Sequence, residues 1–260
     1  MTAPGARDQA SCLVQKLSHY MTLTARDREL LATMEKSTID VGRGVDVVQG
    51  DRGHDYLYVV KSGWLYDFVD LPDGRRTITR IHHPGDVIGL ADVPAEVSPR
   101  SVRTCEGVQL CPFPRSALAH VFEQSPPLAS LFFALLAREH LALVDRVRAV
   151  ARMSARERVG HLLVELMARL RIGDACNGTL TTTSFRLPLN QTEIGDALGL
   201  TNVTVSKTLN QMENDELIRR FADRIELRQE HRLRHMCDFV DRYASMRTDW
   251  LPIDMPAAAE

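Results

Sequence analysis

The side chains best suited to chemistry lie on one predicted helix near residues 201–213. Short or flexible polar residues recur on its outer face: Asn202, Thr204, Ser206, Lys207, Asn210 and Gln211. Such side chains can reach base edges and phosphates when a helix enters the major groove of DNA. A solvated helix face has a similar composition, so the polar face by itself leaves both interpretations open.

Two short helices are predicted to position this face. Asn190 and Glu193 form a helix cap and its capping partner, and Thr201 caps the second helix. Gly199 lies between them, where a sharp turn needs a left-handed backbone. The inward-facing residues are Ile194, Ala197 and Leu198 in the first helix, and Val205, Leu209 and Met212 in the second. Two helices joined by a glycine-centred turn form a helix-turn-helix, which favours DNA binding over a solvated face.

A hairpin is predicted directly after the second helix, in the segment IRRFADRIEL of residues 218–227. Arg219, Arg220 and Arg224 lie on this hairpin, where they would meet phosphates of the DNA backbone. A hairpin next to a helix-turn-helix makes the predicted module a winged helix.

Residues 45–113 have the pattern of a small antiparallel β-barrel or roll. Short runs rich in strand-forming residues alternate with Gly-containing turns: VDVV, YLYVV, WLYDFV, TITRI and DVIGL. Asp73-Gly74 is a tight hairpin signal. A further run over 102–113 closes the region, and Pro112 and Pro114 are expected to stop that strand.

Predicted helices lie on both sides of the roll in the sequence. Residues 24–35 predict a short helix, 126–153 a long one, and the capping box Ser154–Glu157 opens another. The long helix has two apolar stripes. It is therefore either a core helix or one that also contacts the same helix of a second chain. We expect the second arrangement, with a dimer surface formed by Leu128, Phe132, Leu136, Leu143, Asp145, Val147 and Val150.

The bulk properties limit the class of protein. The chain has 260 residues, 44% hydrophobic and 25% charged, and a formal net charge of −2. We find no long apolar run that would span a membrane and no secretory signal, and the five cysteines are scattered. We therefore expect a cytoplasmic protein that does not contact a membrane. The acidic balance argues against DNA binding by overall charge, so a local basic face must supply it.

The whole pattern resembles the CRP/FNR family of transcription regulators. The resemblance covers roughly residues 20–230 and is strongest in EIGDALGLTNVTVSKTLNQMENDELI and in LYVVKSGWLYDF with PDGRRTITRIHHPGDVIG. It implies an α+β fold with five parts along the chain. These are an N-terminal extension (1–20), a cyclic-nucleotide-binding-like antiparallel β-roll as sensor (21–125), a dimerisation helix (126–153), a winged helix-turn-helix (154–235) and a C-terminal tail (236–260).

Members of this family bind palindromic double-stranded DNA as homodimers and recruit or block RNA polymerase, and the resemblance implies the same here. The position match places Thr201, Asn202, Val203, Ser206 and Lys207 in the base-reading stretch. Many members carry Glu at the Val203 position and Arg at the Lys207 position, so the usual half-site is in doubt. The full predicted interface is Thr201, Asn202, Val203, Thr204, Ser206, Lys207, Asn210, Arg219 and Arg220.

The resemblance does not carry over to a cofactor, and we expect none. Cyclic-nucleotide binders hold the ribose with Gly-Glu, whereas Gly89 is followed here by Leu90, and Arg100-Ser101 lies close to the next strand. Oxygen-sensing members use clustered N-terminal cysteines, but only Cys12 is near the N-terminus and Cys111 is in the roll. His82-His83 would point to opposite faces of a strand, which argues against a shared metal.

Two questions stay open at this point. Asp145 is either a solvated acid paired with Arg146 or Arg148, or, as the resemblance implies, an acid that faces its symmetry mate and opposes dimerisation. The competing function is a ligand-binding regulatory module whose helix-turn-helix is only structural. An enzyme is not expected, because the sequence has no Gly-rich phosphate loop, Ser/His/Asp set or HExxH motif.

Overall fold

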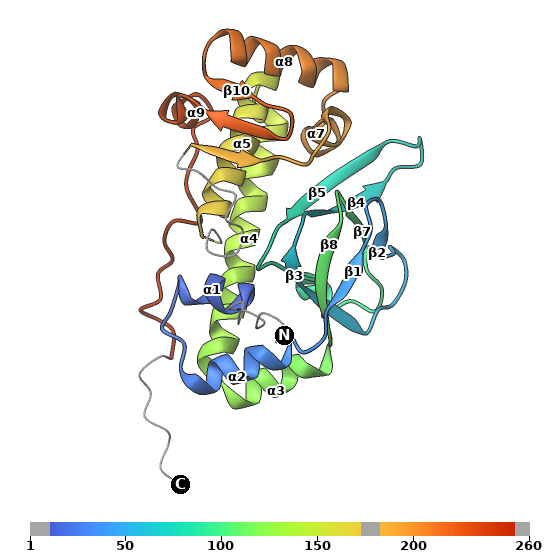
Figure 1. Cartoon of the computed structure of the whole chain (residues 1–260), viewed down its shortest axis with the longest axis vertical. Helices are drawn as coiled ribbons and strands as arrows, with labels where there is room; N and C mark the ends of the chain where they lie inside the picture. The colour runs from blue at the N-terminus through green and yellow to red at the C-terminus, as the bar shows by residue number, and fades with distance from the viewer. Residues whose placement is uncertain (1–10, 173–182, 253–260) are drawn as a thin grey trace, which may run out of the picture.

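The computed structural model describes residues 11–172 and 183–252. One long helix, α4 (Pro126–Arg152), runs through the molecule and joins its two halves (Figure 1). A β-roll and three helices lie toward one end of α4, and a winged helix-turn-helix lies at the other. The predicted α+β fold is therefore confirmed, and the β-roll half and the helix-turn-helix half share a single long helix.

The β-roll consists of two four-stranded antiparallel sheets, ordered β1-β8-β3-β6 and β2-β7-β4-β5. Between them lies a core of small aliphatic residues that includes Val60, Leu65, Ile88 and Leu110. The alternation of buried and exposed residues along the strands places these side chains on the inner faces. The strand bounds are Ile39–Val41, Asp46–Val48, Tyr56–Ser62, Leu65–Asp70, Arg76–His82, Val87–Ile88, Ser101–Thr104 and Val108–Pro114 for β1 to β8, with a short 3-10 helix η1 at Leu90–Asp92.

The last run of the roll differs from the prediction in two ways. The expected strand over 102–113 is two strands, β7 and β8, in different sheets. Pro112 and Pro114 do not stop β8, which continues to Pro114 and pairs with Tyr56 and Tyr58 of β3. β1 pairs only with residues 108–110 on the other side of β8. Beyond that point β8 has one open edge, where proline's missing N–H costs no ladder hydrogen bond.

Three helices cover one end of the roll: α1 (Cys12–Ser18), α2 (Ala25–Thr33) and α3 (Ser116–Gln124). Ser11 caps α1, and Thr24 forms a capping box with Asp27 at the start of α2. Leu13 and Leu17 of α1 are almost fully buried in a core shared with the roll and α4. The segment expected as an N-terminal extension therefore contributes a packed helix.

The winged helix-turn-helix begins with α5 (Ala155–Ile172), which runs back alongside α4 until Ile172 packs against the core of the N-terminal helices. Its sheet has the order β10-β11-β9. The remaining elements are β9 (Ser184–Arg186), α7 (Gln191–Leu198), α8 (Asn202–Asn214), β10 (Ile218–Arg220), β11 (Arg224–Leu227) and α9 (Glu230–Met236). Residues 173–182, which the polar, Gly-containing sequence predicts to be a loop, lie outside the described residues.

Residues 237–252 form what we call the C-terminal strap, which descends from α9 along α4 toward α1 (Figure 1). Tyr243 anchors it, because only 2% of its surface is exposed. Its hydroxyl donates to Glu165 of α5 at 3.1 Å, and its carbonyl accepts a hydrogen bond from Tyr20 at 3.3 Å. The strap thus connects the helix-turn-helix half with the sensor half.

The roll and the winged helix also share one hydrophobic core. Trp64, Tyr66 and Ile78 of the roll belong to the same buried cluster as Ile194 and Leu198 of α7. Trp64 and Tyr66 therefore pack in the protein interior, against the helix-turn-helix as well as within the roll. The position of α7 depends on the roll beneath it.

α4 is also apolar and long enough to cross a membrane by length and composition alone. A core helix passes the same test, and α4 has the features of one. Arg138 and Asp145 on this helix are buried against other parts of the protein, with 7% and 8% of their surfaces exposed. Charged side chains packed against protein in this way identify the face of α4 that belongs to the core.

Histidine burial predicts how stability changes with pH. His83 is fully buried beside Asp86, Lys16 and Arg169, and desolvation lowers its pKa well below the ordinary 6.5. The unfolded chain therefore binds a proton more readily than the folded one, so stability falls as pH drops below 6.5. This group contributes a slope of up to about 1.4 kcal/mol per pH unit. His83→Gln should remove that part of the slope between pH 6.5 and 5 in urea unfolding. His120→Gln, at an exposed histidine, should keep the pH slope of the wild type. Equal slopes in the two variants would show that His83 does not cause the loss of stability.

Candidate DNA interface

The two helices of the helix-turn-helix are fixed by local hydrogen bonds. Asn190 caps α7: its side chain accepts from the Glu193 backbone N–H at 2.9 Å, while the Glu193 carboxylate accepts from the Asn190 N–H at 2.8 Å. Gly199 then ends α7 in the left-handed conformation, with φ of 63°. Thr201 caps α8 by accepting from Thr204 N–H at 3.1 Å. All three features are confirmed predictions from the sequence.

α8 has one buried face and one free face. Val205, Leu209 and Met212 are at most 4% exposed and pack onto the domain core. Figure 1 shows α8 at the end of the molecule farthest from α1 and α2, with no other element outside it. The outer positions are exposed at Thr201, Asn202, Val203, Lys207, Asn210 and Gln211, and partly buried at Thr204 and Ser206. The polar face read from the sequence is thus available to a macromolecule.

The three wing arginines differ in what they contact. Arg220 is held inside the module, because its guanidinium bonds Glu213 at 2.8 Å and the Asn210 side-chain oxygen at 2.6 Å. Arg224 donates to the Ser184 hydroxyl at 3.1 Å. Arg219 is exposed, with its guanidinium 5.1 Å from the centre of the Phe221 ring. Sequence reasoning treated the three alike, because Glu213 and Ser184 lie outside the hairpin that it considered.

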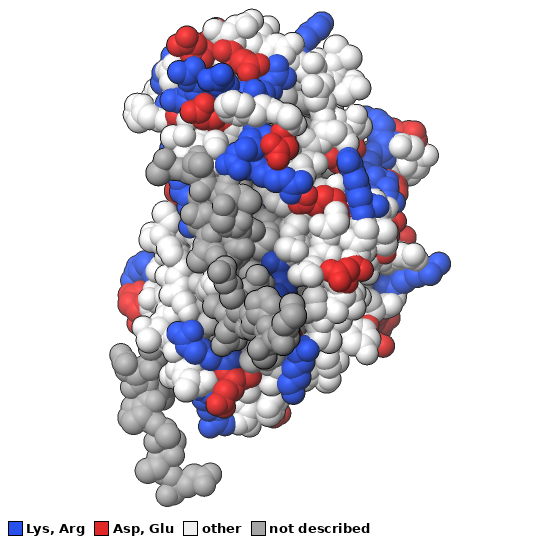
Figure 2. Space-filling view, in the orientation of Figure 1, with Lys and Arg blue, Asp and Glu red and all other residues white. Residues whose placement is uncertain are grey.

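Charge at this end of the molecule is mixed. On the face drawn in Figure 2, Lys and Arg residues gather over the helix-turn-helix half beside Asp and Glu. In the same half of the molecule, Arg156 of α5 pairs with Asp215 at the end of α8, 2.5 Å apart. The interface is therefore not a uniformly basic patch. Lys207 and Arg219 are cations on the exposed side of α8 and the wing.

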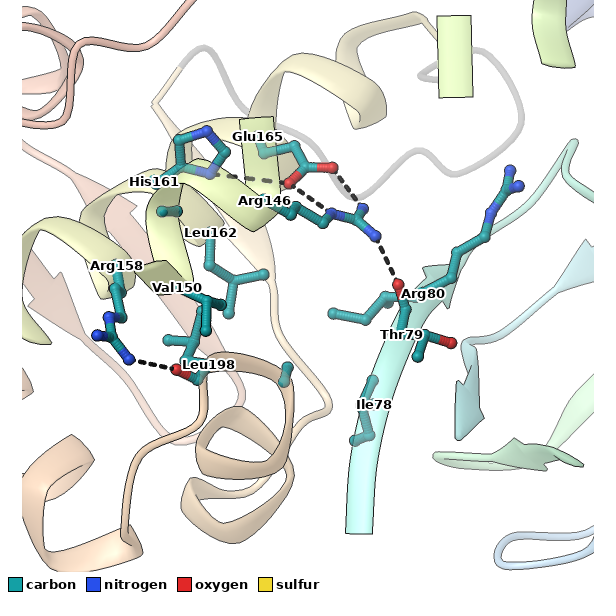
Figure 3. A pocket seen from close by; sticks show the side chains of 13 residues that line it. Ile78, Thr79, Arg80, Arg146, Val150, Arg158, His161, Leu162, Glu165 and Leu198 are labelled. Carbon is teal, nitrogen blue, oxygen red and sulfur yellow. Dashed lines mark hydrogen bonds and ion pairs between the residues drawn. The ribbon is translucent and has the colours of Figure 1, made fainter. Parts of the chain in front are cut away.

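Hydrogen bonds where α4, α5, α7 and β5 meet position the helix-turn-helix relative to the roll (Figure 3). Arg146 of α4 donates to Glu165 of α5 at 2.5 Å and to the Thr79 carbonyl of β5 at 2.8 Å. Arg158 of α5 donates to the Leu198 carbonyl, at the end of α7, at 3.1 Å. These bonds surround an open cavity of about 400 Å³. The helix-turn-helix is therefore joined to the sensor roll by polar bonds as well as by the shared core.

Comparison with known proteins agrees with both halves of the structure. Residues 47–125 match the model of the cyclic nucleotide-binding domain, and residues 157–236 match that of the Crp-like helix-turn-helix domain. The transcriptional activatory protein AadR of Rhodopseudomonas palustris is 30% identical over 217 residues, which are 84% of this chain and 87% of AadR. This chain belongs to the CRP/FNR family.

Other relatives support the same assignment. The transcriptional activator protein Anr of Pseudomonas protegens is 28% identical over 207 residues, covering 80% of this chain and 83% of Anr. The structure of FixK2 from Bradyrhizobium japonicum superposes with a TM-score of 0.67 at 27% identity, covering 77% of this chain and 96% of FixK2. Residues 237–252 begin directly after the helix-turn-helix match ends at 236, so the strap lies outside the part that this model describes.

The predicted dimer residues of this CRP/FNR protein do not share one surface. Leu143, Val147 and Val150 are 44–61% exposed on α4. Leu128 and Phe132 are buried in the protomer, so their assignment to a dimer surface is wrong. The reason is that α3 covers the first turns of α4, where the Phe122 and Phe132 ring centres are 6.4 Å apart. Leu136 is partly buried. Phe133, Leu141 and Val144 are also exposed apolar residues of α4, although they were not among the predicted dimer residues.

Asp145 is also misassigned. It is 8% exposed, and its two oxygens accept hydrogen bonds from Arg242 of the strap at 2.9 and 3.3 Å. Neither earlier interpretation holds, because the partner is not Arg146 or Arg148 and the carboxylate does not face outward toward a symmetry mate. No sequence signal connects two residues 97 positions apart, so only the fold could reveal the pair.

The cavity between the roll and α4 of this family member holds an arginine that is already paired with carboxylates. An open cavity of about 710 Å³ lies between the roll and α4, and Arg100 lines it despite the expectation that it lies too near the next strand. Arg100 already pairs with Asp67 at 2.8 Å and Asp92 at 2.9 Å. Although burial opposes ionisation, His82 and Arg100 hold the pKa of Asp67 below its ordinary value. Arg100 is therefore occupied by two carboxylates, and Leu90, which lies outside the lining of this cavity, has no side-chain acceptor for a ribose hydroxyl.

The two cysteines considered for a cluster are both buried. Cys12 donates a weak hydrogen bond to the Lys61 carbonyl, and burial raises the pKa of the Cys111 thiol. Within residues 11–172 and 183–252, no three or more His, Cys, Asp or Glu residues are grouped as a metal site. His82 bonds Asp67 at 2.6 Å, whereas His83 lies 3.9 Å from Asp86. The two histidines thus have different partners, as their adjacent strand positions predict.

The Arg242 contact predicts what substitution of Asp145 does. Asp145→Ala should lower the free energy of unfolding by about 1–3 kcal/mol, because a charged hydrogen-bonded pair is broken. Arg242→Ala should cost a similar amount, and the double variant little more than either single one. Urea unfolding measures all three. Additive losses, or a tighter dimer in Asp145→Ala by sedimentation, would show that the pair does not hold the strap.

Proposed function

We propose that this protein is a transcription regulator that binds double-stranded DNA as a homodimer, with α8 in the major groove. The observation that carries the proposal is the exposed polar face of α8 at the end of the molecule. The N-caps of α7 and α8 and the turn at Gly199 hold this face in place. In a two-fold dimer, two such helices would lie about 34 Å apart and read a palindromic site. AadR and Anr are named as transcriptional activators, which supports the same role here.

The residues divide into base-reading and backbone-contacting groups. Thr201, Asn202, Thr204 and Ser206 offer short hydrogen-bonding groups at the start of α8, and Val203 offers an apolar surface suited to a thymine methyl. Lys207 supplies one positive charge without the planar fork of arginine. Arg219 on the wing would contact phosphate. Asn210 and Arg220 hold each other and Glu213, so they would present the wing to the DNA backbone in a fixed position.

The wider biology follows from the family. We infer that the protein works in the cytoplasm, contacts RNA polymerase from its DNA site, and has no catalytic activity of its own. The named relatives are transcription regulators, and the polar groups of α8 and the wing suit binding better than bond-making chemistry. The β-roll would act as the sensor, with an effector other than a cyclic nucleotide.

Lys207 gives the first test of DNA binding. Selection from genomic fragments should recover a palindrome, and Lys207→Ala should weaken binding to it by roughly 1–3 kcal/mol if Lys207 reads a base. If Lys207 meets only phosphate, affinity should drop on all sequences and the salt slope should fall by about one unit. Lys36→Ala, an exposed lysine far from α8, should change neither. A wild-type protein that selects no sequence would favour the regulatory module whose helix-turn-helix is only structural.

The exposed stripe of α4 gives the test of the dimer. Leu143→Glu with Val147→Glu should place charge in the interface between two copies of α4 and yield monomers by sedimentation. DNA affinity should fall in parallel, because one recognition helix cannot engage both half-sites. Val69→Glu, at an exposed apolar residue of β4, is the matched control and should stay dimeric. A wild type that is monomeric at micromolar concentration would contradict the proposal.

A further inference from the structure

A cluster of buried charges lies where α1, the roll, α4 and α5 meet. Asp86 is its centre: Lys16 of α1 lies 2.5 Å away, Arg169 of α5 3.0 Å and Arg80 of β5 3.8 Å. Asp86 is buried, and although desolvation opposes ionisation, Lys16 and the neighbouring cations hold its pKa well below the ordinary value. Asp86 therefore carries its negative charge and is shared by three cations.

The second carboxylate of the cluster is Glu139 on α4. Arg138 lies 3.3 Å from it and Arg80 3.5 Å. Four cations thus share two carboxylates, and the side chains are only 2–20% exposed. Buried charge needs a partner of opposite sign, because the interior solvates it poorly. Among these six side chains the cations outnumber the carboxylates. Glu165 also acts on Arg169, and Asp67 on Arg80, but Glu165 is paired with Arg146 and Asp67 with Arg100.

Neighbouring aromatic rings relieve only part of this excess. The Arg138 guanidinium lies 5.0 Å from the centre of the Tyr20 ring and 4.9 Å from that of Tyr243. Burial raises the pKa of both tyrosines, so neither ring supplies a negative charge. Cation–π attraction is worth much less than a charge-assisted hydrogen bond to an anion. Among the described residues, the cations of the cluster are therefore not fully balanced by anions.

A small cavity that opens to solvent gives such a counter-ion a place to bind. Its polar wall is formed by Lys16, Arg80, Asp86, Arg138 and Glu139. The Nε atoms of both Arg80 and Arg138 are buried without an acceptor in the described part of the chain. Its apolar wall includes Leu13, Leu17, Phe132 and Leu135.

Glycine at position 85 allows α1 to complete this wall. Gly85 has φ of +84°, and a Cβ there would lie 2.9 Å from Lys16 Cδ. Any other residue would be strained at this φ and would push Lys16 away from Asp86. Lys16 belongs to α1, outside both domain matches at 47–125 and 157–236. The cationic wall is thus built in part by a segment that neither domain model includes.

We propose that this cavity binds a small oxyanion, such as phosphate or a short dicarboxylate, through Lys16, Arg80 and Arg138. The anion would balance the charge of the cluster and accept hydrogen bonds from the Nε–H groups of Arg80 and Arg138. It would also tie α1 to α4, and through Asp86 and Arg169 to α5. The proposal does not depend on DNA binding.

Thermal unfolding of the full chain tests the proposal with inorganic phosphate as the probe. Phosphate should raise the melting temperature in a saturable way, whereas sodium chloride at matched ionic strength should not. Lys16→Met should raise the half-saturating phosphate concentration at least tenfold, and Lys16→Arg should restore binding. Lys36→Met, at an exposed lysine, should behave as wild type. Parallel titrations with sulfate and malonate separate phosphate from carboxylate ligands.

Arg80→Met provides a second variant if Lys16→Met does not fold, because Arg80 is 20% exposed and its removal leaves Lys16 and Arg169 on Asp86. It should weaken the response to the same anion. The proposal is overturned if none of the three anions gives a saturable shift in the wild type. It is also overturned if Lys16→Met, or Arg80→Met in its place, responds like Lys36→Met, since the effect would then be non-specific.

Discussion

The buried ion pair between Arg146 and Glu165 holds the two halves of this molecule together. Glu165 is 3% exposed and accepts from Arg146 through both oxygens, at 3.2 and 2.5 Å. The same pair reaches the roll through the Thr79 carbonyl and the strap through the Tyr243 hydroxyl. Burying two charges is favourable only when their remaining hydrogen-bonding capacity is used, and losing one partner costs about 3–5 kcal/mol. The hydrogen bonds of Arg146 and Glu165 therefore restrict how α5 can pack on α4.

The placement of α5 determines the placement of α8. α5 leads into the helix-turn-helix, and Arg158 bonds the end of α7, whose apolar side packs on the roll. An effector can shift DNA affinity only if it interacts differently with two arrangements of these elements. The contacts that would differ are already visible: the Thr79 bond, the α7 contact with β5, and the charge cluster around Asp86. The strap adds a fourth contact, so the DNA-binding end is held on both sides of α4.

Sequence patterns predicted those features that neighbouring residues determine. The caps at Asn190 and Thr201, the turn at Gly199 and the wing hairpin each depend on residues within a few positions, and all are present. The errors involve contacts between distant segments. Phe132 is covered by α3, and Asp145 meets the strap. Helical periodicity finds apolar faces, but it cannot say which face another segment covers.

Internal pairing of the arginines leaves little unbalanced positive charge at the DNA-binding end of a chain whose net charge is −2. Arg156 and Arg220 near α8 are paired with Asp215 and Glu213. They add order to the domain but little unbalanced charge, so non-specific attraction to phosphate is weak. Salt dependence scales with the number of phosphates neutralised, and the cations exposed on α8 and the wing include Lys207 and Arg219. On the proposed interface, affinity would then come mainly from the hydrogen-bonding and apolar groups of α8 on base edges, which favours discrimination between sites over tight binding to any DNA.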